Sequence, residues 1–355
     1  MKEEYYNVIG LMSGTSLDGV DLAHIQFKIS NQKWTFKILE SETIEYHPNW
    51  ITKLKQAVDF SEEELKNLNE EYTQLLAVII SDFIKKYIIE NLDAVCSHGH
   101  TILHQPQNGF TLQIGNLPKL ASLIQQTVVC DFRVQDVQMG GQGAPLVPIG
   151  DRILFNEYDY CMNLGGFSNV SFEQNNKRIA FDISPVNTVL NFYANQLGLN
   201  YDDKGEISKK GKTNMTLLNT LNDLDFYKKT PPKSLGFEFV KEIVLPLIEN
   251  FNIPIEDKLH TFTEHVAMQI ALALPNKKGS LLITGGGAYN SFLLERIQFY
   301  LPEIKIIIPT NKILEFKEAL IFALLGVLKL RGEINTLSSV TGAKSDHSSG
   351  YIYTP

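Results

Sequence analysis

The chain has 355 residues, of which 44% are hydrophobic and 20% are charged, and its formal net charge is −8. This length exceeds what a single hydrophobic core usually supports, so two domains are expected. The acidic balance argues against a nucleic-acid-binding protein, because such proteins normally carry a basic face.

The first half of the chain predicts three strands, then a helix, then two further strands. An apolar run at Tyr6–Met12 predicts the first strand, and a polar turn separates it from the second. Ser61 precedes three glutamates, a pattern typical of a helix N-cap with an acidic first turn, and this helix should reach about Glu90. The other predicted strands are Val20–Phe27, Thr35–Tyr46, Asp93–Ser97 and Thr127–Asp131.

The second half also opens with strand, Gly-Gly turn and strand. This repeated pattern predicts that the two halves of the chain have related folds. Its predicted strands are Tyr160–Leu164, Val170–Phe172, Arg178–Ile183, Ser280–Thr284 and Ile304–Ile308. Its predicted helices are Asn187–Leu197, Glu238–Asn250, Glu256–Leu274, one from Asn290 and one from Glu315. This alternation predicts an α/β fold with largely parallel sheets apart from the opening hairpins.

The domain join is placed near Gly140–Asp151, where glycine, proline and small residues cluster. We therefore expect an N-terminal lobe over residues 1–145 and a C-terminal lobe over residues 146–355. The polar, glycine-containing stretch Asn200–Lys212 predicts a mobile loop.

Several features indicate a cytoplasmic protein. The three cysteines lie far apart and form no CxxC pair, which favours reduced thiols over a disulfide scaffold. The acidic start of the chain does not resemble a signal peptide. The longest apolar run, Ala319–Leu328, is too short to span a bilayer and predicts a buried helix.

Three glycine-containing turns are candidate anion sites. They are Ser13–Gly19, Asn163–Asn169 and Thr284–Asn290. Backbone N–H groups and hydroxyls in such turns can bind phosphate, and Asp18 and Asp21 could hold Mg²⁺ directly or through water. A plain hairpin turn or a ligand-free glycine turn is the alternative. The donor-rich Ser-Gly-Thr-Ser sequence and the three consecutive glycines favour a nucleotide held between two related lobes.

Other candidate residues have two readings from the sequence alone. Asp182 ends a predicted strand and could be a general base or a helix N-cap. Arg133 lies beside two aspartates and could bind an anionic ligand or form a structural salt bridge. His100 and His104 have the i, i+4 spacing of a helical metal pair, but their segment predicts a strand end, so a metal site is disfavoured. His98 and His104 then line a pocket or satisfy core hydrogen bonds.

The order and spacing of ten segments resemble those of the anhydro-N-acetylmuramic acid kinase family, within the sugar kinase, actin and Hsp70 superfamily. The segments are Gly10–Asp21, Ser97–Thr101 with His104, Thr111–Gly115, Asp131–Arg133, Gly140–Pro148, Asn163–Gly166, Phe181–Asp182, Pro231–Ser234, Gly285–Asn290 and Glu318–Ala319. Together they cover nearly the whole chain.

The resemblance implies two related lobes of the ribonuclease H-like, actin-like ATPase type around a central cleft. It implies a Mg²⁺- and ATP-dependent kinase that opens 1,6-anhydro-N-acetylmuramic acid with water and phosphorylates O6, in peptidoglycan recycling and amino-sugar catabolism. It also makes a homodimer plausible, with no nucleic-acid or membrane partner.

The resemblance assigns roles to named residues. Asp182 is the implied catalytic base. The implied nucleotide and phosphate contacts are Gly14, Thr15, Ser16, Asp18, Gly19, Asp21, Gly165, Gly166, Gly285, Gly286, Gly287 and Asn290, with Asp18 and Asp21 also as metal ligands. The implied substrate contacts are His98, His104, Arg133 and Glu318, although Glu318 also suits a first-turn carboxylate that complements the helix dipole.

Two positions depart from the family pattern. Ser184-Pro185-Val186-Asn187 stands where the family usually shows glycine-proline-glycine-asparagine, and His100 stands where glutamine is usual. Side chains at former glycine positions predict a differently shaped loop beside Asp182. This change favours the alternatives, a non-catalytic or regulatory Hsp70-like nucleotide-binding protein or a kinase for a different anhydro-sugar. The intact first turn together with Asp182 favours the kinase.

Overall fold

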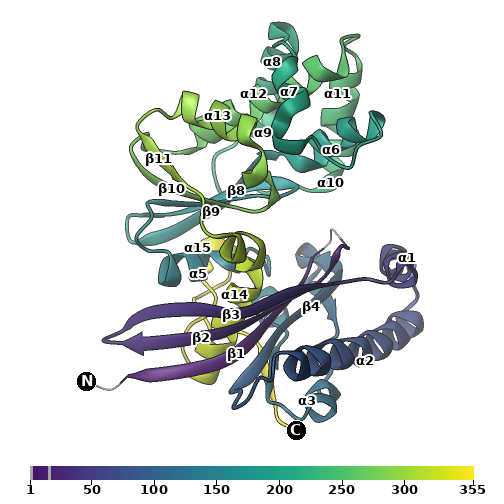
Figure 1. Ribbon diagram of the computed structural model, residues 1–355, viewed down its shortest axis with the longest axis vertical. Coiled ribbons are helices and arrows are strands. Elements are labelled where there is room, and N and C mark those ends of the chain that lie inside the picture. The colour runs from purple at the N-terminus through teal and green to yellow at the C-terminus, as the bar shows by residue number, and fades with distance from the viewer. Residues whose placement is uncertain (1–2, 15–16) are drawn as a thin grey trace. The chain divides into compact units, whose positions relative to one another are not determined.

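The computed structural model describes residues 3–14 and 17–355. Thr15 and Ser16, two of the predicted phosphate contacts, therefore lie outside the described residues. The chain divides into two compact units (Figure 1). The first unit is Met1–Leu154 with Phe316–Pro355, and the second unit is Phe155–Glu315.

The first unit is built on a seven-stranded sheet with the order β12-β6-β4-β1-β2-β3, in which β5 also pairs with β4. Strands β1, β2 and β3 form an antiparallel meander, whereas β4 and β6 run parallel to β1. The bounds are β1 Glu4–Ser13, β2 Gly19–Ser30, β3 Lys33–Glu45, β4 Ala94–Gln105, β5 Phe110–Ile114, β6 Val128–Cys130 and β12 Tyr351–Tyr353. The five strands predicted for this half are confirmed, and β5 and β12 are additional.

Alternation along β1 directs two helices to opposite faces of this sheet. Ile9 and Leu11 share a core cluster with α2 (Glu62–Lys86), whereas a Cβ on Gly10 would stand 1.9 Å from the carbonyl oxygen of Ala319 in α14. Because successive side chains of a strand point to opposite faces, α2 and α14 cover different sides. The predicted start of α2 is confirmed, since Ser61 and Glu64 form a reciprocal capping box.

The remaining helices of the first unit are short. They are α1 Pro48–Gln56, η1 Ala57–Asp59, η2 Pro106–Asn108, α3 Lys119–Ile124, α4 Val134–Gln138, α5 Val147–Leu154 and α15 Ser338–Thr341.

The last part of the chain belongs to the first unit, although the sequence placed it in the C-terminal lobe. Helix α14 (Asn311–Leu330) begins before the predicted Glu315 and is interrupted at Phe316, where the unit boundary falls. Beyond this point it packs so closely on the sheet that a Cβ on Gly326 would stand 2.2 Å from Cys96 Sγ. Strand β12 then pairs with β6. Because of these contacts, residues 316–355 belong to the first unit although they follow the second unit in the sequence.

The second unit contains a five-stranded sheet with the order β11-β10-β7-β8-β9. An antiparallel meander, β7-β8-β9, again continues into two strands parallel to the first, β10 and β11. The bounds are β7 Tyr160–Leu164, β8 Phe167–Gln174, β9 Lys177–Pro185, β10 Gly279–Thr284 and β11 Ile304–Ile307. Both units therefore share one strand order and set of directions, which confirms the predicted duplication within an α/β fold.

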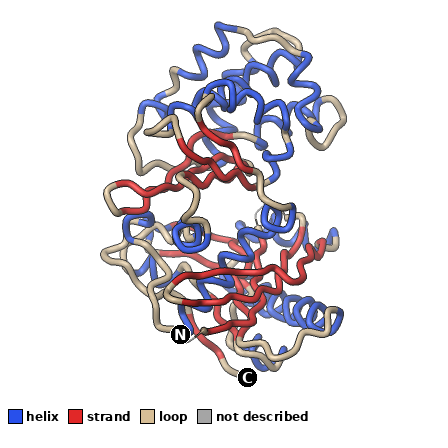
Figure 2. Tube along the Cα trace, turned by 60° about the vertical axis from the view of Figure 1, so that its left-hand side comes forward, coloured by secondary structure: helices blue, strands red, loops and turns tan. Residues whose placement is uncertain are grey.

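Helices pack on the sheet of the second unit (Figure 2). They are α6 Asn187–Gln196, η3 Asp203–Gly205, α7 Glu206–Lys210, α8 Met215–Asn222, α9 Asp225–Lys228, α10 Phe237–Phe239, η4 Val240–Val244, α11 Leu245–Glu249, α12 Ile255–Ala273, η5 Gly286–Tyr289 and α13 Ser291–Tyr300. The helix predicted over Glu238–Asn250 is divided into α10, the π-helical η4 and α11.

The prediction of a mobile loop over Asn200–Lys212 is wrong. The segment forms η3 and α7, and the carboxylate of Asp202 accepts hydrogen bonds from the backbone of Ile207 and Ser208 at 2.8 and 2.9 Å. Asp202 is 6% exposed, so this buried carboxylate holds the helix start in place. In the described residues no helix is long and apolar enough to cross a membrane.

Candidate functional site

The first predicted phosphate turn connects β1 and β2. Leu17 N–H donates to the carbonyl of Gly14 at 3.4 Å, and Leu17 has a left-handed backbone with φ of 59°. Gly19 has a packing role of its own, because a Cβ there would stand 2.4 Å from the carbonyl oxygen of Ile44 in β3. Asp18 is exposed. In the described part of this turn, the Asp18 side chain is thus at the surface and Gly19 is packed against the sheet.

A buried chain of polar groups lies directly below this turn. Ser13 Oγ shares hydrogen bonds with Tyr46 OH at 2.6 Å and with His100 Nδ1 at 2.8 Å, and Tyr46 OH shares one with Tyr72 OH at 2.5 Å. All four side chains are less than 9% exposed. Burial lowers the pKa of His100 to about 4, so its imidazole is neutral at physiological pH. The network therefore anchors the last residue of β1 without a charge.

The two aspartates of the turn are compatible with a magnesium ion. Asp21 lies on β2, opposite Met12 of β1, and its Oδ1 accepts a hydrogen bond from Thr43 Oγ1 at 2.6 Å. Both carboxylates raise the pKa of Tyr46 beyond the larger effect of burial, so both lie near that phenol. The described residues contain no group of three metal-ligating side chains. Mg²⁺ typically uses one or two carboxylates with waters and substrate phosphates, so this donor set fits.

Arg133 is the centre of the predicted substrate contacts. Its Nε donates to His98 Nε2 at 2.8 Å, and its Nη1 donates to the carbonyl of Gly143 at 2.6 Å. Since His98 Nε2 accepts, the imidazole proton is on Nδ1, which donates to the carbonyl of Gly99 at 3.0 Å. Burial, and then the Arg133 cation, holds the pKa of His98 well below its usual range. His98 is thus a neutral acceptor that orients the guanidinium.

The other predicted substrate contacts surround the same cation. Glu318 is exposed and lies within electrostatic range of Arg133. Burial and the Arg133 charge both lower the pKa of His104, whose Nδ1 shares a hydrogen bond with Thr111 Oγ1 at 2.9 Å. His100 and His104 both lie on β4, so the helical metal pair does not form. The first unit therefore gathers His98, His104 and Glu318 around Arg133.

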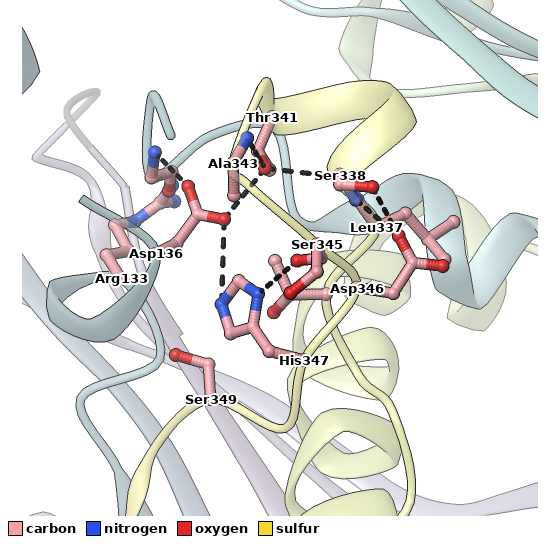
Figure 3. A network of polar contacts seen from close by, with 12 residues as sticks. Arg133, Asp136, Leu337, Ser338, Thr341, Ala343, Ser345, Asp346, His347 and Ser349 are labelled. Atoms are coloured by element: carbon pink, nitrogen blue, oxygen red, sulfur yellow. Dashed lines mark hydrogen bonds and ion pairs between the residues drawn. The ribbon is translucent and has the colours of Figure 1, made fainter. Parts of the chain in front are cut away.

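A second buried carboxylate supports the Arg133 loop (Figure 3). Asp136, which is fully buried, accepts hydrogen bonds from Gly143 N–H at 2.6 Å and from Thr341 Oγ1 at 2.7 Å, and its Oδ1 lies 3.6 Å from His347 Nε2. Gly143 is the residue whose carbonyl holds Arg133. The C-terminal segment thus reaches the candidate site through Asp136, a residue that sequence reasoning did not select.

In the second unit, the Gly165-Gly166 turn contacts the start of α6. The carbonyl of Gly166 accepts hydrogen bonds from Val186 N–H at 2.8 Å and Thr188 Oγ1 at 2.9 Å, and the carbonyl of Gly165 accepts one from Asn187 N–H at 3.3 Å. These carbonyls accept the hydrogen bonds at the start of α6, because Val186, the residue at the N-cap position, has an apolar side chain that makes no capping hydrogen bond. The first N–H groups of α6 are therefore already used within the protein.

The Gly285–Gly287 turn packs against the end of β7. A Cβ on Gly285 would stand 2.4 Å from Asn163 Oδ1, and one on Gly287 would stand 2.7 Å from the Cβ of Leu164. A Cβ on Gly286 would have its nearest neighbour at 3.9 Å. Two of these glycines are thus required by packing, and Gly286 alone leaves open space for a ligand.

Asn290 has a local structural role. Its Oδ1 accepts a hydrogen bond from Leu293 N–H at 2.9 Å and caps α13, and its side chain is 8% exposed. This contact explains the asparagine without a nucleotide.

Asp182 lies inside β9, not at its end, and it caps no helix. Its Oδ2 accepts a hydrogen bond from Leu235 N–H at 2.8 Å, and its own N–H donates to the carbonyl of Lys233 at 3.0 Å. Burial raises the pKa of Asp182, and the Leu235 N–H partly offsets this. Asn169 stands directly opposite on β8. A half-buried carboxylate with a raised pKa, and without a capping role, has the character of a general base.

The sequence did not select several residues that the geometry connects to these side chains. Leu235 acts through its backbone and Thr341 comes from a distant segment, so neither carries a local signal. Tyr46 ends the third predicted strand, and His100 was considered only as half of a disfavoured metal pair and as a departure from the family pattern. A buried tyrosine at the end of a strand gives no sign of its partner before the fold is known.

The comparisons with known proteins concern nearly the whole chain. The family model of anhydro-N-acetylmuramic acid kinase matches residues 6–355. Three proteins named anhydro-N-acetylmuramic acid kinase are similar. Those of Francisella tularensis subsp. novicida, Haemophilus influenzae and Pseudomonas fluorescens are 34%, 33% and 35% identical. The alignments cover 96%, 99% and 97% of this chain and 97%, 98% and 98% of those proteins.

Among solved structures, component A of (R)-2-hydroxyglutaryl-CoA dehydratase from Acidaminococcus fermentans is 13% identical, with a TM-score of 0.46 over 92% of this chain and 99% of that one. Sequence similarity rather than this structural likeness identifies the family. The chain belongs to the anhydro-N-acetylmuramic acid kinase family.

Proposed function

We propose that this protein uses MgATP and water to convert 1,6-anhydro-N-acetylmuramic acid into N-acetylmuramic acid 6-phosphate and ADP, in cell-wall recycling. Membership of the family supports this substrate and reaction. The observation in the structure that carries the proposal is Asp182, a half-buried carboxylate whose Oδ2 is held by Leu235 N–H. Such a group can take a proton from water at neutral pH.

Asp182 is the proposed base for the opening of the anhydro bridge. Water adds to C1 while the C1–O6 bond breaks, the carboxylate accepts the proton released by the water, and O6 bonds to the γ-phosphorus as ADP leaves. The raised pKa of Asp182 strengthens it as a base relative to an ordinary aspartate.

Arg133 is the proposed anchor for an anionic group, either the sugar carboxylate or a phosphate. Burial lowers its pKa to about 10, so it remains cationic at neutral pH. Two of its donors are used by His98 and Gly143, which fixes the plane of the guanidinium. A planar, oriented guanidinium suits bidentate recognition of an anion.

The Gly14–Asp21 turn of the first unit is the proposed phosphate contact. In the second unit, the open side of Gly286 is proposed separately as a nucleotide contact. Asp18 and Asp21 would hold Mg²⁺, which neutralises phosphate charge when bound. The remaining predicted nucleotide contacts stay proposals, because these residues either have packing roles or lie outside the described residues. They include Thr15, Ser16, Gly165, Gly166, Gly285, Gly287 and Asn290.

The reaction is tested by following ADP release with and without the anhydro-sugar in water enriched in ¹⁸O. The proposal requires sugar-dependent ADP and a 6-phosphorylated sugar that carries one ¹⁸O at C1. Label in inorganic phosphate, with unchanged sugar, would mean plain ATP hydrolysis and would support the regulatory alternative. Comparison with 1,6-anhydro-N-acetylglucosamine, which lacks the lactyl carboxylate, tests the alternative of a different anhydro-sugar.

A cytoplasmic location and a homodimer are also proposed. MgATP is an intracellular co-substrate, and the three cysteines, all among the described residues, are buried and form no disulfide, as expected for a protein that needs none. Phe237 in α10 and Ile243 in η4 are 58% and 43% exposed, and these helices are the proposed contact between two copies. Light scattering of the purified protein measures its oligomeric state directly.

A further inference from the structure

The motif Pro231-Pro232-Lys233-Ser234 resembles the family pattern, but none of the roles proposed above involves it. In the structure it begins a segment without helix or strand, residues 231–236, between α9 and α10. This segment lies along β9, which is the edge strand of the five-stranded sheet. It meets β9 at Asp182 through two hydrogen bonds, from Asp182 N–H to the carbonyl of Lys233 and from Leu235 N–H to Asp182 Oδ2.

The Lys233 side chain anchors this segment to α9. Lys233 Nζ lies 4.6 Å from the centre of the Phe226 ring, and the Phe226 ring packs 5.3 Å from that of Phe239. Phe226 belongs to α9 and Phe239 to α10, and Phe226 is 7% exposed. The segment is therefore held to α9 by the Lys233 side chain and to β9 by the Lys233 carbonyl, which fixes the backbone two residues before the Leu235 N–H.

The two oxygens of Asp182 have different surroundings. Oδ2 accepts a hydrogen bond from Leu235 N–H at 2.8 Å, whereas none of the described residues donates one to Oδ1. Lys233, the nearest cation in the segment, is directed to Phe226, and Asn169, opposite on β8, is neutral. Since a hydrogen bond holds one oxygen and the strand fixes the Cα, the carboxylate plane is set and Oδ1 is presented for another partner.

We propose that residues 231–236 position the general base, with Leu235 N–H fixing Oδ2 of Asp182 so that Oδ1 takes the proton from the attacking water. This inference rests on the proposed function and adds the atom that acts and the element that orients it. Leu235 acts through Asp182 and is a positioning residue.

Replacing the Leu235 N–H by an ester oxygen tests this inference without changing any side chain. The α-hydroxy analogue of leucine can be placed at position 235 by nonsense suppression in the full chain. A matched control is glycolic acid at position 236, because neither Gly236 N–H nor the Leu235 carbonyl has a recorded partner in the described residues. The pH dependence of kcat and both KM values are measured for each protein.

The expected result follows from the loss of one donor to a carboxylate. Without Leu235 N–H the pKa of Asp182 rises, so the acidic limb of kcat should move up by about one pH unit, and kcat near that limb should fall about tenfold. At higher pH kcat should partly recover, and KM for MgATP should not change. The ester at position 236 should behave like the wild type.

An acidic limb that stays in place in the position-235 ester would overturn the inference, as would an equal shift in both esters. Loss of kcat at all pH values without a shift would mean a purely structural role and would also overturn it. If the wild type gives no sugar-dependent ADP, the proposed function fails first. If Asp182→Asn keeps wild-type turnover, the base assignment fails while the kinase remains.

Discussion

Replacing Asp136 with asparagine measures how strongly the C-terminal segment is tied to the loop that holds Arg133. The fully buried carboxylate accepts two hydrogen bonds, from Gly143 N–H and Thr341 Oγ1, and faces His347 Nε2 at 3.6 Å. An asparagine keeps only one acceptor oxygen and carries no charge. A hydrogen bond to a charged group contributes about 1.5–3 kcal/mol, so Asp136→Asn should destabilise the first unit by about 2–4 kcal/mol.

Thr341→Val provides the matched smaller change. It removes one of the two donors and preserves side-chain shape, so it should cost about 1–2 kcal/mol. Both tryptophans, Trp34 and Trp50, belong to the first unit, so tryptophan fluorescence during urea unfolding reports on that unit. With a slope of about 3 kcal/mol per molar urea, Asp136→Asn should lower the midpoint by about 1 M.

The order of the two variants is the critical result. An unchanged midpoint for Asp136→Asn would show that its hydrogen bonds contribute no net stability. A larger loss from Thr341→Val than from Asp136→Asn would place the stabilisation in the α15 helix itself, and not in the carboxylate.

Four further variants test the candidate site. Asp182→Asn should abolish turnover but not lower stability. Because burial raises its folded pKa, the stability linked to this group is present at low pH and lost as pH rises through that pKa, and a neutral side chain avoids the loss. Steady-state rates and urea midpoints at neutral pH check both parts. Gly285→Ala should destabilise the second unit by about 2 kcal/mol or more, because Gly285 has a φ of 85° and a Cβ there would contact Asn163. Gly286→Ala should keep the stability and raise KM for MgATP. Thermal unfolding measures the first effect and steady-state kinetics the second. Tyr46→Phe should raise KM for MgATP several-fold and leave KM for the sugar nearly unchanged; equal changes in both would count against a role in supporting the phosphate turn.

The sequence predicts the strands of each unit, although not their order in the sheets, because its signals are local. The apolar strand at Tyr6–Met12 and the capping box at Ser61 depend on residues within a few positions of one another. The same local information misplaced residues 316–355. Their assignment depends on the pairing of Tyr351 with Cys130 and on the bond from Thr341 to Asp136, which join positions far apart in the chain.

The glycines show a second limit of sequence reasoning. Three consecutive glycines predict a ligand turn, yet Gly285 and Gly287 are required by close packing against Leu164 and its neighbour Asn163. A glycine can be required because a ligand approaches the backbone or because another strand does. The sequence shows the same residue type in both cases. Only the positions of the neighbouring atoms separate the two causes, and they leave Gly286 as the residue with space beside it.

The same reasoning bears on the replacement of glycine by Ser184 and Val186 next to the base. The described backbone has no positive φ at either position; Val186 has a φ of −132° and is fully buried, and its N–H donates to Gly166. Ser184 is buried too, and its N–H donates to Ser168 Oγ at 3.2 Å. Both side chains are therefore buried in the second unit, although Val186, with a φ of −132° and a ψ of −93°, lies outside the main β and right-handed α regions. The substitution that favoured a non-catalytic protein is accommodated by packing, and it leaves the carboxylate of Asp182 with its Leu235 donor.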